Sequence, residues 1–272
     1  MRTFFDRIFS RKPANATAES VISLYSQDYP SPDNAFKLFE GEWTSKVPGV
    51  PTGQIDLFSD GRIDWLTQQC GGLSGKSILE LGPLEGGHTH MLAKAGAGRI
   101  LSIEANRQAF LRCLVVQAAL KFDAEFLLGD FRSYLKDTEE RFDFLLASGV
   151  LYHMTNPEDM LADMARVAPR IGIWTHYFDR KVLGRSLGFR KKFDAEPEIK
   201  RVGNREIRKY GQRYLNALNW KGFCGAGAMG SHWLERDDIT GILEDLGFSI
   251  TIAFDDPGHI NGPSFLFYAE RK

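Results

Sequence analysis

Two acidic residues stand where short apolar runs end, and a third lies within such a run. Glu104 ends a run 22 positions after Gly82, Asp130 follows a later run, and Glu80 lies within the first one. A carboxylate can accept hydrogen bonds from both hydroxyls of a ribose, and another can accept from the exocyclic amine of adenine. Glu104 is placed to bind a ribose in this way, and Asp130 could accept from an adenine. The alternatives are a solvated acid near a helix start for Glu104 and a helix N-cap for Asp130.

A glycine-rich turn follows the first run and can bring bare backbone close to a ligand. It contains Gly82 and Gly86, and a helix is predicted to resume at about Thr89 to Ala95. Helix N-termini bind anions through free N–H groups, so strand, turn and helix predict a nucleotide-sized pocket. The turn lacks the middle glycine of a dinucleotide-binding fingerprint, since Leu84 stands there. This disfavours a nicotinamide cofactor.

A second group of residues could take part in a reaction. Ser148 ends the fourth apolar run, Tyr152 and His153 follow it, and His176 ends the fifth. An imidazole titrates near neutral pH and can take a proton from a hydroxyl, which makes His153 the first candidate base and His176 the second. The alternative for either is a histidine hydrogen-bonded within its loop. Phe131, directly after Asp130, could stack on an adenine ring or turn into the core.

Two stretches carry a family resemblance. Glu80, Gly82 and Gly86 stand as in motif I of the class I S-adenosylmethionine-dependent methyltransferases, although Leu84 departs from the usual second glycine. The segment Gly149–His153 resembles one in the bacterial tRNA wobble-uridine carboxymethyltransferase-like branch. The resemblance runs from motif I through the fifth strand. It implies S-adenosyl-L-methionine as cofactor, with Glu80, Gly82, Gly86, Glu104, Asp130, Phe131 and Ser148 as binding residues and His153, Tyr152 and His176 as catalytic ones.

The elements that must position these residues alternate between strand and helix. Strands are expected near 77–81, 99–103, 125–128, 142–147 and 171–175, helices near 106–121, 157–167 and 236–246, and a closing hairpin at 248–254 and 263–269. The fold class is therefore α/β. We expect a Rossmann-like seven-stranded sheet, mostly parallel with a C-terminal antiparallel hairpin, helices on both faces and a lid inserted after strand 5.

The chain divides into three expected parts. Residues 1–75 are an N-terminal helical arm, residues 76–177 and 234–272 the cofactor-binding core, and residues 178–233 a basic substrate-binding lid. Phe36, Phe39 and Trp43 have the spacing of a short amphipathic helix. The first twelve residues place several phenylalanines on one helical face, which suits contact with a membrane surface, a targeting segment or docking on the protein itself.

The lid carries a local charge surplus. From Arg180 to Arg213 there are twelve Lys or Arg residues against four acids, while the whole chain has a net charge of −1. A basic lid favours a small anionic substrate, with RNA as a weaker possibility, and Tyr210, Tyr214 and Trp220 could stack on a ring. The alternative is a solvated face. Glycines between residues 222 and 230 suit a hinge.

Composition limits the remaining choices. The 272 residues include three scattered cysteines and no apolar run that approaches the length of a membrane span, so we expect a cytoplasmic protein. No metal is expected, since His176 and Asp179 lack a convincing third ligand. The oligomeric state is not indicated. The sequence predicts a methyltransferase acting on a hydroxyl of a small anionic metabolite or sugar. Its alternatives are a tRNA-modifying (carboxy)methyltransferase and a catalytically idle, cofactor-binding regulatory subunit.

Overall fold

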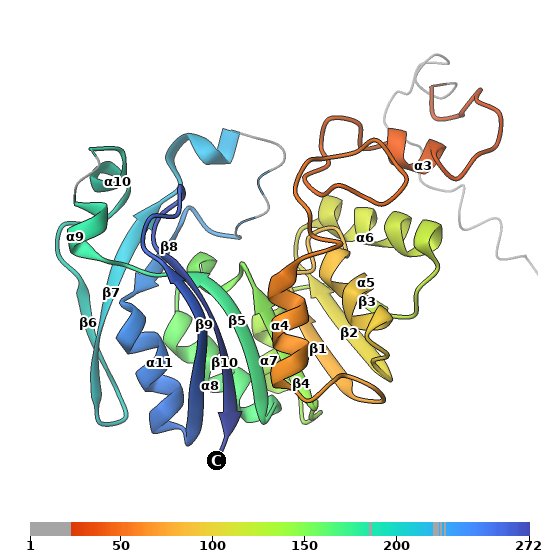
Figure 1. Ribbon diagram of the computed structural model, residues 1–272. Helices are drawn as coiled ribbons and strands as arrows, with labels where there is room; N and C mark the ends of the chain where they lie inside the picture. Colours follow the sequence, from red (N-terminus) through yellow and green to blue (C-terminus); the bar gives the residue numbers. More distant parts are fainter. Residues whose placement is uncertain (1–22, 185–186, 220–222, 224, 226) are drawn as a thin grey trace, which may run out of the picture.

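A seven-stranded sheet forms the centre of the molecule. The computed structural model describes residues 23–184, 187–219, 223, 225 and 227–272. The strand order is β3-β2-β1-β4-β5-β10-β9, and β1 to β5 are parallel while β10 runs antiparallel to both β5 and β9 (Figure 1). This confirms the predicted fold class and closing hairpin. The strands are β1 (Ser77–Leu81), β2 (Arg99–Glu104), β3 (Glu125–Leu128), β4 (Phe144–Ser148), β5 (Arg170–His176), β9 (Phe248–Asp256) and β10 (Ser264–Arg271).

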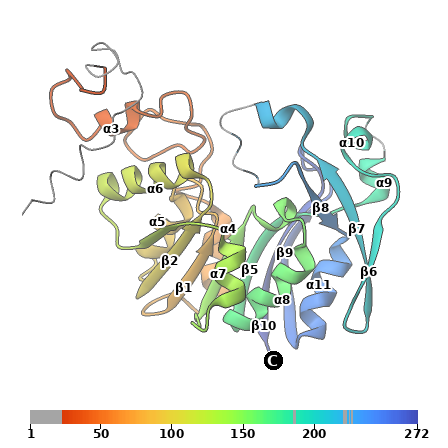
Figure 2. The same ribbon diagram turned by 180° about the vertical axis from the view of Figure 1, so that it is seen from behind.

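Helices cover both faces of this sheet because its strands are apolar on both sides. Ile78 of β1 packs with α4 (Gly61–Gln69) and α5 (Gly87–Lys94), whereas the next residue, Leu79, faces the opposite cluster. That second cluster contains α7 (Phe131–Asp137), α8 (Pro157–Val167) and α11 (Arg236–Asp245), which lie in front in the rear view (Figure 2). A sixth helix, α6 (Arg107–Leu120), packs along β2 and β3.

Local sequence signals account for most helix boundaries. Asn106 caps α6 by accepting from the backbone N–H groups of Gln108 and Ala109, and Pro157 opens α8. The sequence did not reveal α7, which has only seven residues and begins directly after Asp130.

The N-terminal arm is less helical than expected. Its first described helix, α3 (Asn34–Lys37), ends before Phe39 and Trp43, so the predicted amphipathic helix through these aromatic residues is wrong. The chain turns back at Gly41, which has a φ of 77°, and the indole N–H of Trp43 donates to the carbonyl oxygen of Phe36. The three rings still pack together, but across a turn. The amphipathic pattern in the first twelve residues lies outside the described residues.

The inserted lid is built around a second sheet that the sequence did not predict. It contains α9 (Arg180–Leu183), α10 (Leu187–Lys192) and the antiparallel strands β6 (Glu198–Val202), β7 (Arg205–Arg213) and β8 (Gly230–Leu234). The described residues also form two 3-10 helices. One of them, η1 (Leu151–His153), follows β4 and contacts β8, and the other, η2 (Leu215–Asn219), follows β7. A buried ion pair joins the lid to α8, since Nζ of Lys209 lies 3.0 Å from a carboxylate oxygen of Glu158. The charge surplus therefore sits on a folded subdomain.

None of the helices that the structure describes is long and apolar enough to cross a membrane.

Candidate functional site

The glycine turn after β1 is held in a left-handed conformation. Gly82, Leu84 and Gly86 all have positive φ angles, of 66°, 57° and 76°, and Gly86 caps α5. A Cβ on Gly82 would lie 3.0 Å from a methyl group of Val150. Leu84 adopts a left-handed backbone conformation, which glycine adopts without strain and a residue with a side chain adopts at some cost.

Glu104 lies beside this turn at the end of β2. Its carboxylate accepts from the backbone N–H of Leu84 at 3.1 Å and from that of Asn106 at 2.7 Å, and the residue is only 5% exposed. Burial raises the pKa of Glu104 to about 7, although these N–H groups act in the opposite direction. The alternative of a solvated acid does not hold. The ribose role of Glu104 stays a prediction.

Glu80 is tied into the sheet below the turn. The residue is 2% exposed, and one carboxylate oxygen accepts from the hydroxyls of Thr89 in α5 and Ser102 in β2. Burial raises its pKa. These bonds hold α5 against β1 and β2, and a direct contact of Glu80 with the cofactor stays a prediction.

Asp130 caps a helix and Phe131 packs in the core, which are the structural roles weighed as alternatives to binding adenine. Asp130 caps α7 by accepting from the backbone N–H of Arg132, whose guanidinium also pairs with it at 2.7 Å. The hydrogen bond from the Arg132 side chain holds the pKa of Asp130 below its usual range. The ring of Phe131 is 8% exposed and packs in the core with Leu135. Contacts of either residue with adenine stay predictions.

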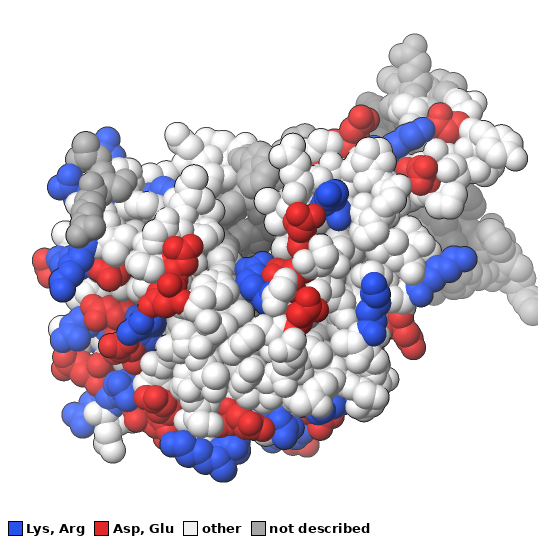
Figure 3. Space-filling model, in the orientation of Figure 1, with Lys and Arg blue, Asp and Glu red and all other residues white. Residues whose placement is uncertain are grey.

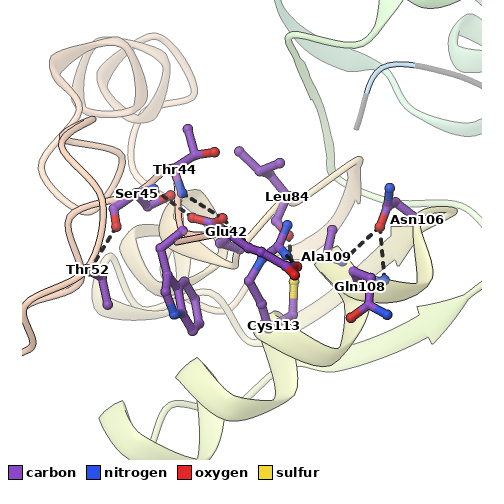
Figure 4. Close-up of polar contacts among 12 residues, drawn as sticks. Glu42, Thr44, Ser45, Thr52, Leu84, Asn106, Gln108, Ala109 and Cys113 are labelled. Carbon is purple, nitrogen blue, oxygen red and sulfur yellow. Dashed lines mark hydrogen bonds and ion pairs between the residues drawn. The ribbon is translucent and has the colours of Figure 1, made fainter. Parts of the chain in front are cut away.

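A polar network joins the arm to the glycine turn. Glu85, the residue after Leu84, is fully buried and accepts from the backbone N–H groups of Thr44 and Ser45 at 3.0 and 2.7 Å. The buried Arg112 of α6 lies 3.1 Å from the same carboxylate. Figure 4 shows Thr44 and Ser45 of the arm beside Leu84 of the turn. Sequence reasoning missed this network because its partners are some forty residues from Glu85 in the chain and share no local pattern.

The three expected catalytic residues lie close together at the carboxyl ends of β4 and β5. Tyr152 and His153 lie on η1, just after Ser148 ends β4, and His176 ends β5. The ring centroid of Tyr152 is 4.1 Å from that of His153 and 4.6 Å from that of His176. Nδ1 of His153 is 3.1 Å from the hydroxyl of Tyr214.

Both histidines are neutral near pH 7. Burial lowers the pKa of His153 to about 3, with a contribution from nearby His176, and lowers that of His176 to about 4. A general base must be unprotonated before it acts, so either imidazole is in the required form. Burial also raises the pKa of Tyr152 to about 12, which keeps its hydroxyl protonated.

Three aromatic residues that sequence reasoning missed complete this cluster. Trp233 of β8 stacks on His176 with a centroid distance of 5.1 Å and an interplanar angle of 3°. Trp174 and His259 contact the same imidazole from β5 and from the turn between β9 and β10. Trp174 stands two residues before His176 on β5, which is a signal that could have found it, whereas His259 arrives only through the hairpin.

The start of α4 links the two halves of the site. Asp60 accepts from Nε2 of His88 in α5 at 2.9 Å and binds Arg62, whose guanidinium lies 4.6 Å from the centre of the Trp174 ring. Although burial alone would raise it, the hydrogen bonds from His88 and Arg62 hold the pKa of Asp60 well below its usual range. The start of α4 thus contacts both the helix that follows the glycine turn and the aromatic cluster.

Much of the basic charge of the lid is paired. Lys200, Lys209, Arg205, Arg208 and Arg213 each lie within 4.0 Å of a carboxylate. Figure 3 shows acidic side chains interspersed with the Lys and Arg residues on the β6 side of the molecule. Tyr210 stacks on Phe178 and is 2% exposed, so it is not available to stack on a substrate ring. Trp220 and Gly222 lie outside the described residues.

Within the described ranges, no group of three or more His, Cys, Asp and Glu side chains is arranged to hold a metal ion.

Comparisons with known proteins agree with this geometry. A family model for a methyltransferase domain matches residues 78–172. The tRNA U34 carboxymethyltransferase of Marinobacter nauticus is 30% identical over 162 residues, which are 56% of this chain and 48% of that protein. The chain thus spans about half the length of the curated relatives it matches.

Two solved structures share the fold. The N-terminal domain of EvdMO1, crystallised with SAH bound and also in the presence of SAH and D-fucose, superposes with a TM-score of 0.62 in the first case. That match has 22% identity and covers 88% of this chain and 94% of the other. Magnesium protoporphyrin IX methyltransferase from Synechocystis PCC 6803, with bound SAH, has a TM-score of 0.51 and 19% identity, covering 78% and 81%. From its sheet order, its glycine turn and the match over residues 78–172, the chain contains a class I S-adenosylmethionine-dependent methyltransferase domain.

Proposed function

We propose that this chain methylates a hydroxyl group of a small anionic metabolite or sugar. The observation that carries the proposal is the meeting of two groups at the carboxyl ends of the strands. The glycine turn and Glu104 lie at β1 and β2, and neutral Tyr152, His153 and His176 lie at β4 and β5. Ligands of open α/β sheets bind at these strand ends. The half at β1 and β2 suits a nucleoside, and the half at β4 and β5 suits a methyl acceptor that must lose a proton.

The residues present fit S-adenosylmethionine. The turn leaves room where a Cβ on Gly82 would approach Val150, and the buried carboxylate of Glu104 can accept a hydrogen bond from a ribose hydroxyl. When bound, this cofactor supplies an electrophilic methyl group on a sulfonium centre.

The protein's share of the reaction is alignment and proton removal. The aromatic rings around His176 exclude water and can pack against a sugar or other ring. A hydroxyl is poorly acidic, so a neutral imidazole within reach is needed to take its proton as the new bond forms. The side chains of the site thus favour O-methylation. Lys181 of α9 and Arg190 and Lys191 of α10 form no ion pair among the described residues, and we assign them to an anionic part of the acceptor.

Binding of S-adenosylhomocysteine tests the cofactor half. Calorimetric titration should give micromolar affinity for wild type and roughly ten- to a hundredfold weaker binding for Glu104→Ala and Asp130→Ala, since each loses one or two charge-assisted hydrogen bonds. NADH is the control ligand. Absence of SAH binding, or binding of NADH instead, would remove the proposal.

A screen of anionic sugars and hydroxylated metabolites tests the acceptor half, with SAH formation as the readout. Conversion of at least one hydroxyl compound is expected. Failure with every compound, in a protein that binds SAH, would favour the idle regulatory subunit.

A second candidate rests on the 30% identity to a tRNA U34 carboxymethyltransferase. It is a tRNA-modifying transfer, with the lid contacting phosphates. Its test is a tRNA binding titration at 50 and 200 mM salt, where several phosphate contacts would weaken binding by orders of magnitude. A flat or undetectable response would leave the small-molecule acceptor as the better assignment.

A further inference from the structure

The turn between β9 and β10 determines which nitrogen of His176 carries a proton. Nδ1 of His176 lies 2.9 Å from the carbonyl oxygen of Gly262 and 3.1 Å from that of Pro263. A carbonyl oxygen can only accept a hydrogen bond, so Nδ1 must be protonated. The lone pair of neutral His176 is therefore on Nε2.

The same turn holds His259 in the opposite tautomer. The backbone N–H of Asn261 donates to Nδ1 of His259 at 3.2 Å. Since an N–H group can only donate, Nδ1 has the lone pair, and the neutral ring carries its proton on Nε2. His259 thus offers a donor where His176 offers an acceptor.

The two rings are neighbours on the side of the site away from Glu104. Their centroids are 5.0 Å apart, and no hydrogen bond joins them in the part of the chain that the structure describes. His176 is 4% exposed and is packed between Trp233 and Tyr152. The titratable groups facing it are Tyr152, His153 and His259. Burial keeps its pKa near 4, so the tautomer persists at neutral pH.

We propose that His176 and His259 form an acceptor and donor pair that recognises the substrate hydroxyl. This rests on the proposed function and deepens it, because a hydroxyl both donates and accepts, whereas a carboxylate only accepts and an ammonium group only donates. His259 donates from Nε2 to the hydroxyl oxygen, and Nε2 of His176 accepts the hydroxyl proton. As the oxygen–methyl bond forms and the sulfur–methyl bond breaks, the proton passes to His176, and the released SAH is neutral.

Long-range ¹H–¹⁵N NMR of the full chain labelled with ¹⁵N-histidine tests the tautomers directly. His176→Gln and His259→Gln assign the signals. At pH 7 we expect protonated Nδ1 in His176 and protonated Nε2 in His259. Either ring in the other tautomer, or His176 charged at this pH, would overturn the proposal.

Two glycines of this turn provide a matched pair. Gly262 has a φ of 114°, and a Cβ added there in Gly262→Ala would lie 3.0 Å from the Trp233 ring. The carbonyl groups that accept from His176 should therefore move, and His176 should show a mixture of tautomers. In Gly258→Ala the nearest atom is a carboxylate oxygen of Asp256 at 3.5 Å, so both histidines should match wild type. An unchanged His176 signal in Gly262→Ala would contradict the role of the turn.

Activity separates this inference from the proposed function. On an acceptor found in the screen, His259→Phe should lower kcat/KM by roughly ten- to a hundredfold, and His259→Gln, which keeps an N–H donor, should lose less. His176→Gln should lose roughly 10²- to 10⁴-fold in kcat. SAH affinity should stay within about twofold in all three. Full activity of His259→Phe would overturn the pair while leaving the methyltransferase assignment intact, whereas loss of SAH binding in wild type would remove that assignment and not the tautomers.

Discussion

The raised pKa of Glu104 predicts that cofactor binding depends on pH. Ribose hydroxyls donate to the ionised carboxylate, and a pKa of about 7 means that this form is lost as the pH falls through neutrality. SAH affinity should therefore be roughly tenfold weaker at pH 6 than at pH 8, as measured by calorimetry. Glu104→Gln should bind weakly and without this dependence. A flat profile in wild type would show that Glu104 does not bind the cofactor as a carboxylate.

Gly82 and Gly71 allow backbone strain to be separated from the shape of the cofactor turn. Both have a φ of 66°, but only Gly82 has a neighbour, Val150, within reach of an added Cβ. Each alanine variant should lose about 1–2 kcal/mol in free energy of unfolding from the left-handed conformation. Only Gly82→Ala should also weaken SAH binding, by roughly tenfold, because the turn must move away from Val150. Equal SAH affinities in the two variants would argue that the turn does not touch the cofactor.

How far a site residue could be predicted depended on whether its neighbours are local. Glu104 was found because the glycine turn and the acid each come at the end of a strand, in two consecutive βα units. His259 was not, because only the antiparallel register of β9 and β10 brings the turn to His176. Phe131 could be read two ways, and its position in the core was decided by α7, a helix too short to show a period in the sequence.

At the scale of elements, the arm is fastened to the glycine turn through the buried carboxylate of Glu85, which also pairs with Arg112 of α6. Glu85→Gln removes the carboxylate that lies 3.1 Å from the buried Arg112 and that accepts from two backbone N–H groups of the arm. The free energy of unfolding should fall by about 3 kcal/mol, because a buried ion pair loses one of its two charges. Urea denaturation measures this. Glu125→Gln, which removes an exposed pair with Arg99, should change stability by less than about 1 kcal/mol. A small effect of Glu85→Gln would show that the arm is held by its aromatic contacts alone.

The elements that were predicted well are the ones with strong periodicity and end signals. The parallel strands are short, apolar runs, and Asn106 and Pro157 mark the helices that follow two of them. The lid strands β6 and β7 instead alternate charged residues with a few apolar ones, so they look like a solvated segment. Their pairing depends on β8, some twenty residues further on, and on acids of α8, neither of which a local pattern reveals.

At the scale of the whole molecule, lid and core should unfold as one unit through Lys209 and Glu158. Lys209→Met should reduce hydrogen-exchange protection across β6, β7 and β8 while β1 keeps its own, since the buried Glu158 loses a partner. Lys200→Met is the matched control, because Lys200 contacts the same carboxylate with a side chain that is 35% exposed. Its effect should be smaller. Equal changes of protection in lid and core would mean that this ion pair does not couple the two.

The position of β10 also constrains how the molecule is made. This strand is synthesised after the other six, yet it lies inside the sheet, between β5 and β9, and the turn before it supplies the carbonyls that hold His176. While a ribosome is still adding β10, the edge of β5 is unpaired and the acceptor side of the site is incomplete. If His176 binds the acceptor as proposed, the nascent chain can form the glycine turn and Glu104 early, but it cannot transfer a methyl group until the sheet has closed.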